Sequence, residues 1–218
     1  MKCKAVFVEL RRTAPLYLDR QGKVIEKLLA NYDSVTMAPG GLTRFEEHIG
    51  VEDARTGFEA RVSGQACVAA KSLVPSMGSD IDIAAFEREA RVFSKFVEPM
   101  VFEGDYTRLG ILFSFHPAGQ ESPHQWYRSF LGVAPPDPWQ TEGLSLRFRN
   151  DRGVEGESIA LQFWGTNGQT LGLAPEAIRV DVDSYRFNVS QHDALNVNLI
   201  DGFKRASSLL EEVIHGAS

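Results

Sequence analysis

The sequence has few cysteines and no long apolar run. Only two cysteines occur in 218 residues, Cys3 and Cys67, so neither a disulfide framework nor metal-ligand spacing is present. No stretch approaches the ~18 consecutive apolar residues that a membrane-spanning helix requires. The apolar run near the N-terminus is ended by Glu9, which makes it too short for a signal peptide. We therefore expect a cytoplasmic protein with no metal, no cofactor and no membrane partner.

Basic residues are also scarce relative to acidic ones. The chain has 23 lysines and arginines against 29 aspartates and glutamates, a formal net charge of −6. This balance disfavours a broad phosphate-binding surface, so we do not expect a nucleic-acid partner. The hydrophobic fraction of 43% and charged fraction of 24% are typical of a globular protein. A chain of this length buries a core without disulfides or metal.

The first half of the chain alternates strand-like and helix-like patterns. Period-two alternation predicts a strand over residues 3–11, and apolar residues at helical spacing between Val24 and Tyr32 predict a helix. Three further strands are predicted over residues 44–49, 57–62 and 66–74. The clearest helix begins at Ser79 and carries an apolar stripe made of Ile83, Phe86, Ala90, Phe93 and Val97.

The second half repeats this order. A strand over residues 109–115 precedes a short helix at 122–125. A hairpin then turns at Asn150–Gly153, a third strand runs from Ile178 to Val189, and a terminal helix runs from Ser190 to Gly216. We therefore expect an α+β fold of two similar strand–helix–three strands–helix halves, residues 1–104 and 105–218. Their antiparallel sheets would be covered by amphipathic helices. We interpret this order as an internal duplication, with the halves fused through one continuous or closely packed antiparallel sheet system, either as two domains or as one.

Polar side chains are predicted to gather on one face of the first sheet. If the first hairpin is symmetric about its loop, His48 lies opposite Glu59 and Glu46 lies opposite Arg61. The same face would carry Glu9, Arg11 and Arg44, and the second half would add Arg147 and Arg149. Exposure to water explains such a face. A groove for a small polar ligand or a polar subunit contact explains it equally.

Two histidines and two aspartates are the other candidates for chemistry. His116 and His124 flank a glycine-containing connection, and histidine titrates near neutrality. Their spacing matches no metal motif, so roles in a loop or helix cap remain open. Asp181 and Asp183 lie on one face of a predicted strand, as two carboxylates sharing a proton or hard cation require. Alternation of a buried and a hydrated face also accounts for them.

Three segments resemble a sporadically distributed family of uncharacterised bacterial proteins. They are the strand Ala5–Arg11, the aromatic helix 86–96 with the following Arg108–Phe113, and Val180–Asp183 before the terminal helix. The resemblance implies no activity. The duplicated strand–helix–sheet order is also similar to bacterial effector-binding domains, which implies a small molecule held in a cleft between the repeats.

The sequence therefore predicts a non-catalytic binding or interaction protein. A small polar ligand would lie between the halves, with candidate contacts from His48, Glu59, Arg61, His116 and His124. One alternative is an enzyme that pairs His116 or His124 with Asp181 or Asp183. Another is a structural or regulatory homo-oligomer, and a protein partner also fits. The sequence assigns no catalytic residue and leaves the oligomeric state open.

Overall fold

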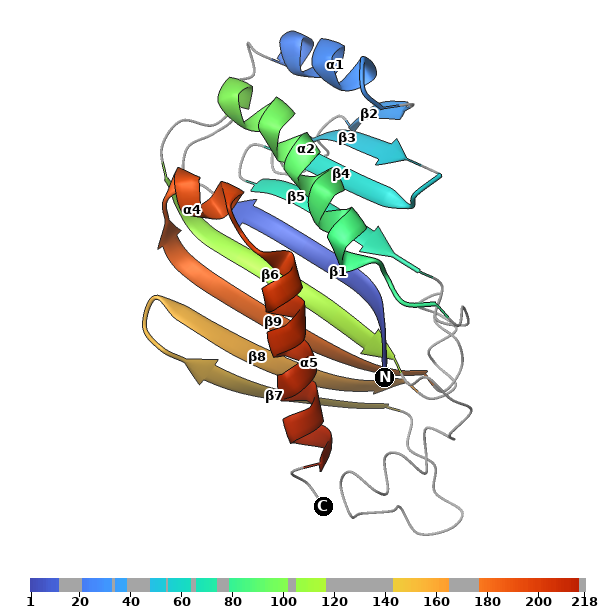
Figure 1. Ribbon diagram of the computed structural model, residues 1–218, viewed down its shortest axis with the longest axis vertical. Coiled ribbons are helices and arrows are strands. Elements are labelled where there is room, and N and C mark those ends of the chain that lie inside the picture. Colours follow the sequence, from blue (N-terminus) through green and yellow to red (C-terminus); the bar gives the residue numbers. More distant parts are fainter. Residues whose placement is uncertain are drawn as a thin grey trace.

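A computed structural model describes most of the chain. The residues outside the description are 12–20, 33, 39–47, 54, 64–65, 74–78, 102–104, 117–142, 165–176 and 216–218. In the remainder, nine strands form one antiparallel sheet in the order β2-β3-β4-β5-β1-β6-β9-β8-β7 (Figure 1). The strands are β1 Lys2–Arg11, β2 Ser34–Ala38, β3 His48–Asp53, β4 Phe58–Ser63, β5 Ala66–Ser72, β6 Tyr106–His116, β7 Gly143–Asp151, β8 Glu155–Trp164 and β9 Ala177–Val189. The helices are α1 Gln21–Leu29, α2 Ile83–Val101, α4 Gln191–Leu195 and α5 Leu199–His215.

The single nine-stranded sheet does not divide into the two similar strand–helix–three strands–helix halves that the sequence predicts. β1 and β6 are neighbours at its centre and pair from Lys2–His116 to Arg11–Arg108, so the ladder runs from β2 to β7 without a break. Four strands follow α1 where three were predicted, because 34–38 forms β2. The prediction of two similar halves was wrong, and the duplication inferred from it loses its support. The predicted helix at 122–125 lies outside the described residues.

The register of the first hairpin also differs from the prediction. β3 pairs Glu52 with Glu59, and His48 lies opposite Ser63 rather than Glu59. The turn explains the difference, because Asp53 ends β3 and its carbonyl accepts the N–H of Gly57 at 2.8 Å. Gly57 has a φ of +68°, a conformation that favours glycine. The hairpin therefore turns tightly at 53–57, and residues predicted to be loop extend β3.

The predicted terminal helix is two helices. Ser190 begins α4 as predicted, because its Oγ accepts the N–H of Asp193 at 3.0 Å. α4 ends after one turn, and the Oδ1 of Asn198 accepts the N–H of Asp201 at 3.1 Å to begin α5. A second capping side chain therefore divides one apolar stripe between two helices.

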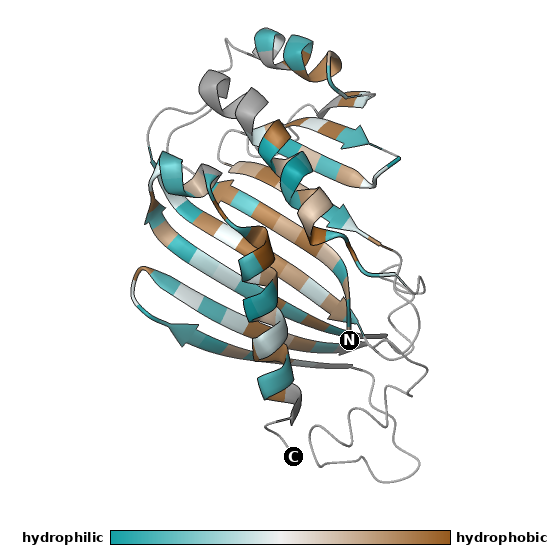
Figure 2. Ribbon diagram, in the orientation of Figure 1, coloured by the Kyte–Doolittle hydropathy of each residue, from teal (hydrophilic) through white to brown (hydrophobic). Residues whose placement is uncertain are grey.

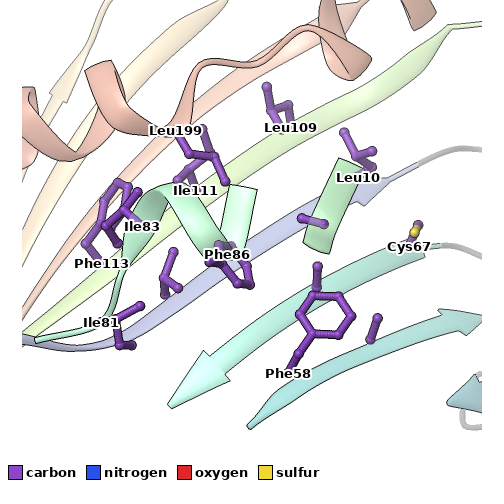
Figure 3. Packing of buried hydrophobic residues seen from close by; sticks show 14 of the residues in the cluster. Leu10, Phe58, Cys67, Ile81, Ile83, Phe86, Leu109, Ile111, Phe113 and Leu199 are labelled. Atoms are coloured by element: carbon purple, nitrogen blue, oxygen red, sulfur yellow. The ribbon is translucent and has the colours of Figure 1, made fainter. Parts of the chain in front are cut away.

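Helices α2 and α5 lie over the same face of the sheet (Figure 1). The predicted stripe of α2 is confirmed from Ile83 to Phe93, where its apolar residues are buried. Phe86 lies 6.0 Å from Phe58 of β4, and Phe203 of α5 lies 5.6 Å from Phe113 of β6, between ring centroids. Figure 3 shows Phe58, Phe86 and Phe113 within this buried layer, and Figure 2 shows the alternation of polar and apolar residues along both helices and the strands.

Both cysteines belong to this apolar layer. Cys67 is buried on β5, and Cys3 is buried on β1. Burial raises the pKa of the Cys3 thiol to about 12, which keeps it protonated and unreactive near neutral pH. None of the described helices is both long enough and apolar enough to cross a membrane.

One carboxylate joins α2 to the start of α5. An oxygen of Glu87 accepts the N–H of Leu199 at 2.8 Å, one of the backbone donors that a helix start leaves without an internal partner. Arg91, one turn later, holds the same carboxylate at 2.8 Å and donates to the carbonyl of Val197 at 3.2 Å. These bonds fix the position of the α4–α5 connection over the sheet.

Replacing Glu87 by glutamine should therefore weaken the α2–α5 junction. We expect Glu87→Gln to lower the free energy of unfolding by about 1–2 kcal/mol, because a charge-assisted bond to Leu199 and the pair with Arg91 are lost. Urea unfolding monitored by circular dichroism measures the change. The matched control is Glu211→Gln on the exposed side of α5, for which we expect less than about 0.5 kcal/mol. Equal losses in both variants would contradict this role.

Candidate functional site

The structure separates the residues that the sequence put forward as ligand contacts. Glu59 and Arg61 are exposed on β4, with a guanidinium nitrogen 3.6 Å from the carboxylate. His116 is buried at the end of β6, with β5 and β1 between it and β4. His48 begins β3, but its side chain lies outside the description, as does all of His124. The described candidates therefore do not meet in one place.

The polar sheet face is present on the side opposite α2 and α5. The register places Glu9, Val68 and Arg61 in one cross-strand row, so the predicted acidic and basic residues of β1 and β4 share this face. Arg44 and Glu46 lie outside the described residues. Glu9 pairs with Arg11 at 2.9 Å and with Arg108 at 2.7 Å, from carboxylate oxygen to guanidinium nitrogen. Charges on this face are thus neutralised by their own neighbours.

Asp181 and Asp183 share this face, as predicted. Asp181 is 7% exposed, receives two bonds of 2.7 Å from Arg179 and accepts a hydrogen bond from Ser114. Burial raises the pKa of Asp183, while Arg108, 3.5 Å away, opposes that rise. Each carboxylate is therefore held beside a guanidinium. Within the described ranges, no group of three His, Cys, Asp or Glu side chains is arranged to bind a metal ion.

Tyr185 lies flat on this face between two glycines. The register aligns Gly110, Tyr185 and Gly156 across β6, β9 and β8. A Cβ on Gly156 would collide with the Tyr185 ring, so glycine leaves the space that the ring occupies. The Arg108 and Arg149 guanidiniums lie 5.7 and 5.4 Å from the ring centroid, within cation–π range. The side chains around Tyr185 on this face therefore contact one another.

A groove of about 590 Å³ lies on the opposite side, where α4 and α5 cross the sheet. Its floor includes Leu109 and Ile111 of β6, both buried. One side is built by the sheet and the β7–β8 turn, from Arg152, Glu155, Gly156, Glu157, Ser184, Tyr185 and Arg186. The other side is the α4–α5 segment, with Asp193, Asn196, Val197, Asn198, Asp201, Gly202 and Arg205. The whole lining comes from residues after 105, so the groove is not a cleft between the two predicted halves.

One strong ion pair joins the two sides of the groove. Arg205 of α5 makes a two-point contact with the Glu157 carboxylate of β8, which is largely buried. The hydrogen bond from Arg205 is the main reason that the pKa of Glu157 is lowered. The other two guanidiniums are held loosely, because Arg152 lies 3.9 Å from Glu157 and Arg186 lies 3.7 Å from Glu155. Both distances exceed hydrogen-bond length.

The sequence does not indicate the groove. Its pattern predicts the turn at 150–153 and the helix start at Ser190, but each of these is a local feature. Arg152 and Asp193 belong to those signals and line the groove together. No spacing in the sequence indicates that they meet, because α4 and α5 must first fold back over β6, β8 and β9.

Protonation of Glu157 should release the contact between α5 and β8. Because the pKa of Glu157 is lowered in the folded state, the pair stabilises the fold above the ordinary glutamate pKa of about 4.3 and is lost as pH falls through the lower value. Allowing for solvent screening of the half-exposed Arg205, we expect Glu157→Gln to cost roughly 0.5–1.5 kcal/mol at pH 7.

The measurement is the difference in unfolding free energy between wild type and Glu157→Gln from pH 7 to pH 3. The difference should shrink below about pH 4, where the wild-type carboxylate also becomes neutral. The control is Glu155→Gln, whose carboxylate is half-exposed and 3.7 Å from Arg186, and its difference should stay near zero. A Glu157→Gln difference that does not vary with pH contradicts this account.

Comparison with known proteins gives no match: no protein-family model, curated protein or solved structure is significantly similar to this chain. The family resemblance noted from the sequence therefore stays a prediction, and any functional assignment depends on the geometry described above.

Proposed function

We propose that this chain is a non-catalytic binding protein for a small polar ligand, and that the groove beneath α4 and α5 holds the ligand. The observation that carries this proposal is the groove itself. Its volume of about 590 Å³ falls within the range of roughly 300–1,000 Å³ found for pockets that bind small molecules. Buried apolar side chains form its floor, and polar groups make up most of the remaining lining, which suits a polar ligand.

The pairing of the charged groups favours the groove, rather than the polar sheet face, as the ligand site. On the sheet face, Arg108 and Arg179 already contact carboxylates at 2.7 Å. In the groove, Arg152 and Arg186 are more than half-exposed and stand beyond hydrogen-bond distance from their carboxylates. Their N–H donors are therefore directed to water, which a ligand displaces at lower cost than a bonded carboxylate.

The chemistry of the lining supports binding rather than catalysis. The described lining contains no histidine, cysteine or lysine, so it offers neither a thiol or amine nucleophile nor an imidazole or amine base that could activate Ser184. The enzyme alternative falls on the other sheet face, where His116 and Asp181 both lie at the end of the β6–β9 ladder. There, the Asp181 carboxylate is occupied by Arg179 and Ser114. We propose a cytosolic location, with a small molecule rather than nucleic acid or a membrane as the partner.

Removal of Arg186 should weaken ligand binding without unfolding the protein. We expect at least one compound from a mixture of small polar metabolites to add its mass to the wild-type protein in native mass spectra. Arg186→Ala should lower the occupancy about tenfold, as expected for the loss of one charge-assisted contact. The same spectra report the number of subunits and so test the homo-oligomer alternative.

Arg61→Ala is the matched control. Arg61 is 60% exposed and 3.6 Å from Glu59, while Arg186 is 65% exposed and 3.7 Å from Glu155. The two substitutions thus remove equivalent ion pairs, one outside the groove and one inside. Equal binding by both variants, or no bound compound in any spectrum, contradicts the proposal.

A further inference from the structure

The two sides of the groove carry different polar groups. The α4–α5 segment presents the carboxylates of Asp193 and Asp201, with Asn196 and Asn198 between them along the chain. The opposite side presents two guanidiniums, Arg152 beside the β7–β8 turn and Arg186 on β9, together with the half-exposed carboxylate of Glu155, which lies 3.7 Å from Arg186. Arg205 does not disturb this division, because its two-point contact with Glu157 neutralises both partners.

Three of the charged groups at the two sides, Arg152, Arg186 and Asp193, have bonding capacity to spare. The carboxylate of Asp201, in contrast, already accepts a hydrogen bond from Asn198 at 2.6 Å and lies 3.5 Å from Lys204. Arg152 and Arg186 hold carboxylates only at 3.9 and 3.7 Å. Within the described part of the chain, the carboxylate of Asp193 makes no hydrogen bond or ion pair; only its backbone N–H is bonded, to Ser190. The acidic side therefore suits a cationic group, and the guanidinium side suits a carboxylate.

The floor of the groove adds a third requirement. Leu109 and Ile111 are apolar and lie between the two polar sides, so a ligand that spans the groove places hydrocarbon over them. Burial of apolar surface contributes affinity, while the charged ends fix the orientation. A ligand that carries only one charge leaves one side of the groove without a partner.

We infer that the ligand is a short peptide with free termini, whose ammonium group faces Asp193 and Asp201 and whose carboxylate faces Arg152 and Arg186. This inference rests on the proposed function and names the chemical class of its ligand. Opposite charges at opposite sides favour a zwitterion whose charged groups are separated by an apolar segment. A dipeptide with bulky apolar side chains carries one charge at each end and presents hydrocarbon on both sides of the peptide unit that joins them.

Three matched compounds test the inference by isothermal titration calorimetry. Leucyl-leucine carries both charges, N-acetyl-leucyl-leucine lacks the ammonium, and leucyl-leucinamide lacks the carboxylate. We expect leucyl-leucine to bind, and each modified peptide to bind at least about tenfold more weakly, because each loses one charge-assisted contact. Binding of either modified peptide as tightly as leucyl-leucine overturns the inference.

Two variants assign each terminus to its side. Arg186→Ala should bind leucyl-leucine and leucyl-leucinamide with affinities that differ by less than about threefold, because the carboxylate then keeps only its contact with Arg152. Asp193→Asn should lose the preference for the free ammonium in the same way. Arg61→Ala should keep both preferences, and melting temperatures show that all three variants are folded. Unchanged preferences in the groove variants overturn the assignment.

Failure of this inference is distinguishable from failure of the proposed function. If leucyl-leucine does not bind, but a metabolite binds to wild type and tenfold less to Arg186→Ala, the groove is a ligand site of another class. If neither the peptide nor any metabolite depends on Arg186, both the peptide class and the groove are wrong.

Discussion

The pairing of β1 with β6 is the interaction on which the described fold depends. Nine residue pairs join the two strands, and they are the link between β2–β5 and β7–β9 in a single sheet. The same pairing builds the core, since it sets Val6 opposite Phe113 and Leu10 opposite Leu109. Phe113 then packs against Phe203 of α5, and Leu109 becomes part of the groove floor. The position of the groove is thus a consequence of contacts at the centre of the sheet.

The sequence predicts those elements whose apolar residues repeat regularly. β1, β6, β9, the β7–β8 hairpin and α2 lie close to their predicted ranges, because alternation or a helical stripe identifies the buried face. The prediction failed at positions where a single residue ends a strand or starts a helix. Asp53 ends β3 and shifts the hairpin register, and Asn198 starts a new helix inside a continuous apolar stripe. The joining of both parts into one sheet depends on the β1–β6 pairing, for which spacing along the chain gives no signal.

The candidate site could be predicted only in part, for a related reason. Alternation correctly places Glu9, Arg11, Glu59 and Arg61 on one face, since strand geometry is local. It does not reveal that Arg108 and Asp183 complete the charge pairs there. The groove combines residues from 109 to 205, and its shape arises only after α5 is anchored by Glu87 and Arg205. A site assembled by tertiary contacts leaves little trace in residue spacing.

The contrast between the two polar surfaces follows from what a ligand must displace. A carboxylate that binds Arg108 competes with Glu9 at 2.7 Å, and the displaced Glu9, which is largely buried, keeps only its pair with Arg11. At Arg186, the competing carboxylate is half-exposed and 3.7 Å away, so it returns to water at little cost. Because the charges of the sheet face are strongly paired with one another, this face is stable but a poor site for a ligand. In the groove the pairing is loose and the floor is apolar, so a ligand would displace water at lower cost. This difference in cost, rather than the number of charges, is why we propose the α4–α5 side as the binding site.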